Sequence, residues 1–299
     1  GTVLSQQAER LLLPFAFWLV FYAFYNLIKA SYFGYAESYL SELNNPTAWF
    51  GYILLGEIKY HMHFIPTLFP ILLAYPLFQL AQRYPILGLT ILVSLLAKRE
   101  VDVFLWSNHQ NLPGFEFALR AIKVACYLGY GMAAGALWGL YQRGRLTWCF
   151  RLSVGLVLVA LVAKLEHARR IAMSGTWEWN FEPAFWADFL TPVGLFALAM
   201  SAPKGIWPEL LVRLAPFSFG LYLMHPIFLD LAEIAISTLG LSPSAQVLAK
   251  ILPTVLLTSV ALYLVARTQA LAWTIGLGPS PLRWRAHIGD RLGNIGQGR

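Results

Sequence analysis

The sequence predicts an all-α fold: a polytopic bundle of membrane-spanning helices with one re-entrant or interfacial segment. Of its 299 residues, 58% are hydrophobic and only 12% are charged, whereas a soluble domain carries about 25% charged residues. The hydrophobic runs are continuous, as over 153–165 and 252–266, whereas the strands of a membrane barrel alternate apolar and polar side chains. This composition excludes an ordinary soluble enzyme, a disordered chain and a nucleic-acid-binding module.

A membrane-spanning helix needs about 20 mostly apolar residues, and we expect eight such spans. They lie near 11–31, 62–81, 84–97, 117–140, 147–165, 184–202, 215–237 and 247–266. The apolar stretch 47–58 is too short to cross, so it is expected to be interfacial or re-entrant. The sequence thus predicts one transmembrane domain over 1–278, followed by a polar cytoplasmic tail over 279–299.

The distribution of charge predicts that both ends of the chain are cytoplasmic. With eight spans, the side that carries the chain start and the tail holds 12 of the 22 Lys and Arg residues but only three of the 15 Asp and Glu residues. Cytoplasmic loops carry an excess of Lys and Arg. This topology makes 33–61, 98–120 and 164–188 long outer segments that mix charge, His and Trp, and such loops favour a site on the outer face.

The net charge of +7 is interpreted as a membrane orientation signal, so no nucleic-acid partner is expected. The two cysteines, Cys126 and Cys149, lie in or beside apolar helices and lack metal-ligand spacing. The sequence therefore predicts no metal site and no tightly bound cofactor.

Histidines near the outer ends of the spans are the first candidates for chemistry, because imidazole is the usual general base near neutral pH. Glu57, His61 and His63 form the densest cluster. Glu57 and His61 are four residues apart and would share one face of a helix, where the carboxylate would orient the imidazole. The alternative is an interfacial helix end whose His, Tyr and Lys side chains lie among lipid headgroups.

An aromatic pair in the last outer segment suits a carbohydrate acceptor. Trp177 and Trp179 flank Glu178, and aromatic rings stack on sugars while carboxylates accept hydrogen bonds from sugar hydroxyls. The alternative is the aromatic belt that lines membrane interfaces.

One histidine is predicted to lie near the middle of the membrane. His225 is about ten residues into the span at 215–237, and Ser218 and Tyr222 precede it by seven and three residues, so the three side chains share a helix face. An ionisable group at that depth needs a partner, a pore or a ligand. A single hydrogen bond to a neighbouring helix is the alternative.

Three motifs carry a resemblance to a known family. The string FSFGLYLMHPIF over 217–228 resembles the pattern Ser-x-x-(Ile/Leu)-Tyr-Leu-x-His of membrane acyltransferase family 3. The stretch 60–78 resembles the family's His-Leu-Trp-Phe-Leu helix entry, with His61 at the His position. The stretch 9–18 is similar to the start of the family's third helix, with Arg10 at a basic position.

The resemblance implies a bacterial inner-membrane O-acyltransferase that moves an acyl group, acetyl above all, from cytoplasmic acyl-CoA to a glycan outside the cytoplasm. It implies a donor site that includes Arg10, Ser218, Tyr222 and His225, with His225 hydrogen-bonded to the thioester or to another base rather than acting as the base itself. Glu57, His61, His63, Trp177 and Glu178 are then the acceptor-site candidates, and His61 and His225 are the catalytic candidates.

The sequence departs from the family at its start. Family members begin with two further helices, of which the first carries an Arg and a His that is essential for transfer in the family. This sequence is expected to correspond to the family from its third helix onward, so the resemblance implies that the family's core catalytic His is not among these residues.

Two other functions stay open. The departure favours a catalytically degenerate subunit of a polysaccharide synthesis or export complex, and buried His225 and Arg120 would suit a small-solute transporter. The expected partners are the lipid bilayer, acyl-CoA and a glycan acceptor, with a polysaccharide synthase or export protein on the subunit interpretation.

Overall fold

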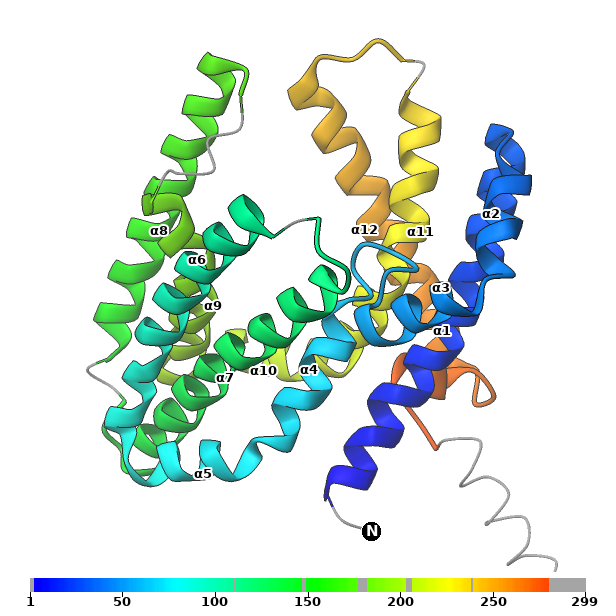
Figure 1. Cartoon of the computed structure of the whole chain (residues 1–299). Helices are drawn as coiled ribbons and strands as arrows, with labels where there is room; N and C mark the ends of the chain where they lie inside the picture. The colour runs from blue at the N-terminus through cyan, green and yellow to red at the C-terminus, as the bar shows by residue number, and fades with distance from the viewer. Residues whose placement is uncertain are drawn as a thin grey trace, which may run out of the picture. The chain divides into compact units, whose positions relative to one another are not determined.

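The computed structural model describes residues 3–109, 111–146, 149–176, 182–202, 206–237 and 239–279. Helices make up most of this part of the chain, and it contains no β-strand (Figure 1). The prediction of an all-α fold is therefore confirmed. Residue 279 is the only part of the predicted tail that the structure describes.

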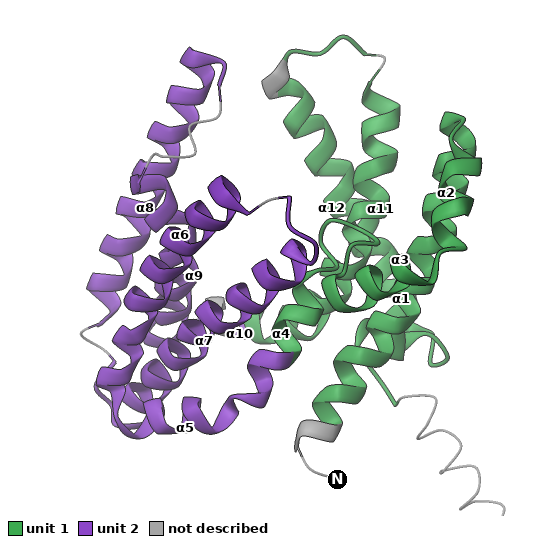
Figure 2. Cartoon of the chain, in the orientation of Figure 1, with its two compact units in different colours: residues 1–69, 210–299 green, residues 70–209 purple. Residues whose placement is uncertain are grey.

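The chain divides into two compact units, which Figure 2 colours separately. Unit 1 comprises Gly1–Phe69 and Leu210–Arg299, and unit 2 comprises Pro70–Glu209. The helices of unit 1 are α1 (Val3–Phe33), α2 (Ala36–Leu43), α3 (Pro46–Phe50), the π-helix η1 (Gly51–Leu55), the 3₁₀-helix η3 (Ala215–Phe217), α11 (Ser218–Ile236), α12 (Pro243–Arg267) and the 3₁₀-helix η4 (Ala272–Ile275). Those of unit 2 are α5 (Tyr75–Arg83), the 3₁₀-helix η2 (Pro85–Leu89), α6 (Thr90–Asn108), α7 (Phe115–Gln142), α8 (Cys149–Ser174) and α9 (Glu182–Ser201). The unit boundaries fall within α4 (Phe64–Leu73) and α10 (Ile206–Leu214).

The predicted spans fall on helical segments, although 62–81 is divided between α4 and α5 and 84–97 between η2 and α6. Fewer of these segments qualify as membrane crossings. Among the described residues, four segments are long and apolar enough: Gln6–Phe33, Glu182–Ser201, Glu209–Ile236 and Ala245–Arg267. The pair α4 and α5, bent by 61°, raises the number to as many as five. The charged run from Lys98 to Asp102 interrupts the apolar character of α6. The number of about eight membrane crossings therefore remains a prediction.

The core of unit 1 forms around α1. Trp18 and Tyr22 lie four residues apart on one face of this helix, and both are buried. The Trp18 indole N–H donates to the Thr274 carbonyl (2.8 Å), and the Tyr22 hydroxyl donates to the Leu223 carbonyl (2.6 Å). These two buried bonds tie α1 to η4 and to α11, which itself packs along α12.

Unit 2 depends on close approach between helices. A Cβ atom added to Gly139 of α7 would lie 2.1 Å from the Gln82 carbonyl oxygen of α5, and one added to Gly135 would lie 2.3 Å from the Phe78 carbonyl oxygen. The same helix is joined to α9 by the Tyr130 hydroxyl, which donates to the Phe189 carbonyl (2.6 Å). Glycine is therefore required where α7 meets the backbone of α5.

Two segments expected as outer loops are largely helical, which corrects that prediction. Within 98–120, α6 continues to Asn108, and within 164–188, α8 continues to Ser174. The charged residues in these segments pair along the helix: Lys98 contacts Asp102, and Glu166 contacts Arg169 (2.7 Å) and Arg170 (3.0 Å). Ion pairs between residues three or four apart stabilise a helix. The charged residues of these two segments therefore lie within helices and do not mark where a helix ends.

We expect Gly139→Ala to lower the free energy of unfolding by about 1–3 kcal/mol, the usual cost of overpacking. Gly155→Ala in α8 is the matched control, because a Cβ atom there meets nothing within 4 Å. That change should be neutral or stabilise the helix by up to about 1 kcal/mol. Thermal unfolding of both variants in detergent measures the difference, and equal melting temperatures would contradict the close α5–α7 approach.

Candidate functional site

The candidate site is built on a turn at residues 56–63, between η1 and α4. Gly56 has φ +72°, and a Cβ atom there would lie 2.5 Å from the His63 backbone nitrogen, so only glycine fits. The Asn26 amide of α1 donates to the Ile58 carbonyl (2.8 Å). The Tyr222 hydroxyl of α11 donates to the His61 carbonyl. Two helices of the core thus hold the turn in place.

This geometry corrects the prediction that Glu57 and His61 share a helix face, because residues 56–63 do not form a helix. The positive φ of Gly56 ends η1 and reverses the chain. The Glu57 side chain instead lies against Gly51, where an added Cβ atom would be 2.3 Å from Glu57 Oε2.

His61 is buried in a cage of rings. Only 5% of the residue is exposed. The centroid of its imidazole lies 5.1 Å from that of Tyr222, 5.4 Å from those of Tyr22 and His225, and 5.5 Å from that of Tyr60, each in an edge-to-face arrangement. Within the described residues, neither ring nitrogen meets the geometry of a hydrogen bond.

The environment keeps this imidazole neutral. His61 lies in the turn, outside the membrane-spanning helices. Burial is the main cause that lowers its pKa to about 3; the nearby side chains of His225, Lys59 and His63 act in the same direction, and the Leu223 backbone acts in the opposite direction. His61 is therefore uncharged across the physiological range.

His225 is oriented by a proline. Pro226 has no backbone N–H, so the Tyr222 carbonyl, four residues earlier, loses its helical donor. His225 Nδ1 lies 2.8 Å from that carbonyl oxygen and 3.2 Å from the Leu221 carbonyl oxygen. Both neighbours are acceptors, so Nδ1 carries the hydrogen and Nε2 keeps a lone pair. The Tyr60 hydroxyl lies 3.4 Å from Nε2.

One comparison with known proteins decides the family. A family model described as an acyltransferase domain matches residues 2–265, most of the chain. The chain belongs to acyltransferase family 3. The resemblance inferred from the three motifs is thereby confirmed, and membership indicates acyltransferase activity in general. With the apolar helices, it also indicates a membrane protein. Searches of curated proteins and of solved structures give no match.

In this member of acyltransferase family 3, only some of the predicted site residues come together. His61, Tyr222 and His225 form the cluster described above. Ser218 begins α11, is exposed and donates to the Ala215 carbonyl (2.8 Å). His63 is exposed, with Nδ1 2.6 Å from the Tyr60 carbonyl oxygen. The predicted acceptor residues Trp177 and Glu178 lie outside the described residues.

Arg10 lies in a separate pocket near the start of α1. The pocket has a volume of about 230 Å³. Its lining combines α1 with the segment after η4 and consists of Gln6, Glu9, Arg10, Trp273, Gly276, Gly278 and Pro279. The Arg10 side chain is exposed. The lining thus holds one cation, Arg10, and one carboxylate, Glu9, and the guanidinium is the group that could contact an anionic ligand.

A buried ion cluster next to the turn was not predicted. The Asp230 carboxylate of α11 contacts Lys59 Nζ at 2.6 Å and Lys29 Nζ at 3.2 Å, and it accepts the Tyr25 hydroxyl at 3.1 Å. One sequence feature could have predicted this cluster: an aspartate lies within the span at 215–237, and ionisable residues in membrane spans need partners. Tyr60 carried no comparable signal, since its partner His225 is 165 residues away.

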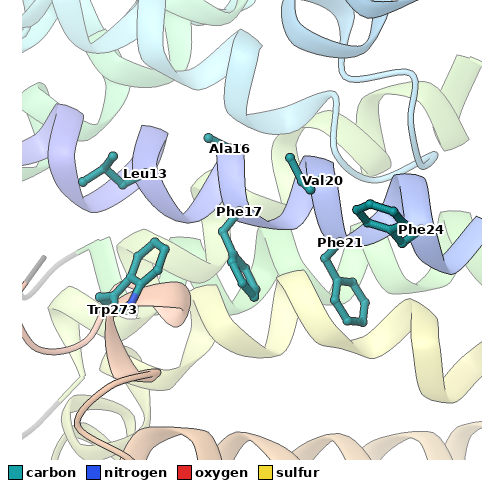
Figure 3. A pocket seen from close by; sticks show the side chains of 7 residues that line it. All are labelled: Leu13, Ala16, Phe17, Val20, Phe21, Phe24 and Trp273. Atoms are coloured by element: carbon teal, nitrogen blue, oxygen red, sulfur yellow. The ribbon is translucent and has the colours of Figure 1, made fainter. Parts of the chain in front are cut away.

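An apolar groove follows the outer surface of α1. Its volume is about 570 Å³, and it is lined by Leu13, Ala16, Phe17, Val20, Phe21, Phe24 and Trp273. Figure 3 shows Phe17 and Phe21 projecting from α1 on the side where Trp273 lies. A spanning helix presents such side chains to lipid, so the groove needs no other occupant.

We predict that His61 makes the folded state sensitive to acid. The unfolded chain binds a proton at this residue near pH 6.5, but the folded chain does so only near its pKa of about 3. Stability is therefore unaffected above pH 6.5 and falls as the pH drops from 6.5 towards 3, by about 2 kcal/mol at pH 5.

Unfolding of the wild type and of His61→Gln at pH 7 and pH 5 measures this loss. The loss should be smaller in the variant, with His109→Gln as the control. An equal pH dependence in all three proteins would show that His61 titrates normally.

Proposed function

We propose that this chain is an O-acyltransferase of the bacterial inner membrane. It moves an acyl group, most simply acetyl, from cytoplasmic acyl-CoA to a hydroxyl of a glycan outside the cytoplasm, and it uses no tightly bound cofactor. Family membership supports acyl transfer in general. The observation that supports this reaction best is the orientation of His225, whose Nδ1 faces two backbone carbonyls.

The reaction needs a proton acceptor. The glycan hydroxyl oxygen attacks the thioester carbonyl carbon, the C–S bond breaks, and CoA leaves as the thiol after taking up a proton. The hydroxyl proton must pass to a base as the C–O bond forms. The Nε2 lone pair of His225 suits this role, and the Tyr60 hydroxyl at 3.4 Å marks where a substrate hydroxyl would approach. A lone pair cannot donate to the thioester oxygen, so we assign His225 to the hydroxyl rather than to the thioester.

His61 supports this step by staying neutral. Its ring lies 5.4 Å from that of His225, so a charge on both imidazoles would be unfavourable. Because burial disfavours the charged form of His61, the positive charge that develops during proton transfer is carried by His225 alone. His61 is thus a positioning residue that also supplies a neutral wall to the site.

The donor is proposed to enter at the Arg10 pocket. CoA carries phosphates, and the exposed Arg10 guanidinium suits bidentate contact with them. The charge distribution of the sequence favours a cytoplasmic location for this end of α1. Association with a polysaccharide synthase or export protein is compatible with this assignment, and the acceptor glycan would be its product.

We expect His225→Gln to lower kcat by about 10²–10⁴-fold, the usual contribution of a general base. Glutamine keeps a donor for the Tyr222 carbonyl but has no basic nitrogen, so the protein should fold normally. Acetyl-CoA-dependent acylation of glycan by the protein in nanodiscs measures the effect, with His109→Gln as the control. Wild-type kcat in His225→Gln would exclude the proposed role, and absence of transfer by the wild type would favour a scaffolding subunit.

For the donor end, we expect Arg10→Ala to weaken CoA binding about tenfold, because one charge-assisted contact is lost. Arg10→Lys should retain part of the affinity. A cysteine at Gln6 should react with an impermeant maleimide in inverted membrane vesicles but not in intact cells. Unchanged CoA affinity, or labelling of intact cells, would contradict a cytoplasmic donor site at Arg10.

A further inference from the structure

The ion cluster at Asp230 carries more positive than negative charge. Lys29 and Lys59 share one carboxylate, with Nζ–Oδ distances of 3.2 and 2.6 Å. The neighbouring pair on α11 and α12, Glu233 and Lys250 at 3.3 Å, is balanced one to one and adds no net charge. One positive charge therefore remains uncompensated among these side chains.

The contacts indicate that Lys29, rather than Lys59, carries the uncompensated positive charge. Asp230 Oδ2 is taken by both Lys59 Nζ and the Tyr25 hydroxyl, whereas Oδ1 faces Lys29 Nζ. The Lys59 side chain is 10% exposed and its ammonium lies 5.4 Å from the centre of the Tyr25 ring, so it is fixed. The Lys29 side chain is 30% exposed. An ammonium has three donors, and among the described residues Asp230 is the only ion-pair partner of Lys29.

The cluster lies at the end of α1 opposite to Arg10. Nineteen residues separate Arg10 from Lys29, which corresponds to about 28 Å along a helix, close to the hydrocarbon thickness of about 30 Å. Along α11, Asp230 follows His225 by five residues, or about 7.5 Å. The excess charge is thus near the reacting histidine and far from the proposed donor pocket.

We propose that Lys29 is an anion-binding subsite for the acceptor, and that it holds a carboxylate or phosphate group of an acidic glycan. This inference rests on the proposed function and specifies its acceptor class. Lys59 and Asp230 form the rigid floor of the subsite, and the Lys29 ammonium supplies the exposed hydrogen-bond donors. A partly buried uncompensated cation favours an anionic partner. The separation from His225 suits an acidic group on the sugar that carries the reacting hydroxyl or on its neighbour.

Binding tests the subsite without any need for transfer activity. The purified chain in phosphatidylcholine nanodiscs is titrated, without acyl-CoA, with a hyaluronan tetrasaccharide, which carries glucuronate, and with neutral maltotetraose. We expect the acidic glycan to bind more tightly, and its affinity to fall with added salt. Lys29→Gln should weaken its binding about tenfold or more, whereas Lys29→Arg should retain most of it.

The double variant Glu233→Gln/Lys250→Gln is the matched control, because it removes a lysine that is also 30% exposed together with the carboxylate that balances it, so the net charge of the region is unchanged. Its affinity for the acidic glycan should equal that of the wild type. Equal binding of both glycans, or equal weakening by Lys29→Gln and by the double variant Glu233→Gln/Lys250→Gln, would overturn the proposal. A second arm uses nanodiscs that contain phosphatidylglycerol: if Lys29 retains that lipid in native mass spectrometry and binds no acidic glycan, the group it holds is a lipid headgroup and the proposal is wrong. Because acyl-CoA is omitted, failure of transfer by His225→Gln and failure of anion binding by Lys29→Gln are separate results.

Discussion

The candidate site is organised around Pro226, which has no backbone N–H. The Tyr222 carbonyl therefore lacks its helical donor and is free for His225 Nδ1, at 2.8 Å. This contact fixes both the ring orientation and the tautomer of His225. The same tyrosine directs its hydroxyl to the His61 carbonyl. One residue of α11 therefore positions two histidines that are 164 positions apart in the chain.

Burial then gives the two histidines different properties. The rings of Tyr22, Tyr60 and Tyr222 surround His61, and removal from water disfavours its charged form. His225 is only half-buried. The two neighbouring imidazoles therefore lie in different environments, and in the proposed reaction they have different roles.

Two cationic residues of unit 1 lie near opposite ends of α1. Arg10 lies in a pocket near one end and Lys29 meets Asp230 near the other. An apolar surface lies along the helix between these two residues (Figure 3). Such an arrangement suits a reaction in which an anionic donor and an acidic acceptor approach from opposite sides of a membrane.

The sequence by itself determined the fold class, the approximate position of most long helices and the family, because continuous apolar runs favour helices in lipid and three short motifs occur in family order. It also identified His61, Tyr222 and His225 as candidates, since each stands in one of those motifs. Only the tertiary structure decided which residues meet. It replaced the predicted Glu57–His61 helix face with a glycine-dependent turn, placed Ser218 outside the histidine cluster, and joined Lys29, Lys59 and Asp230. These contacts join residues as many as 201 positions apart, and helical periodicity carries no information about which faces of distant helices pack together.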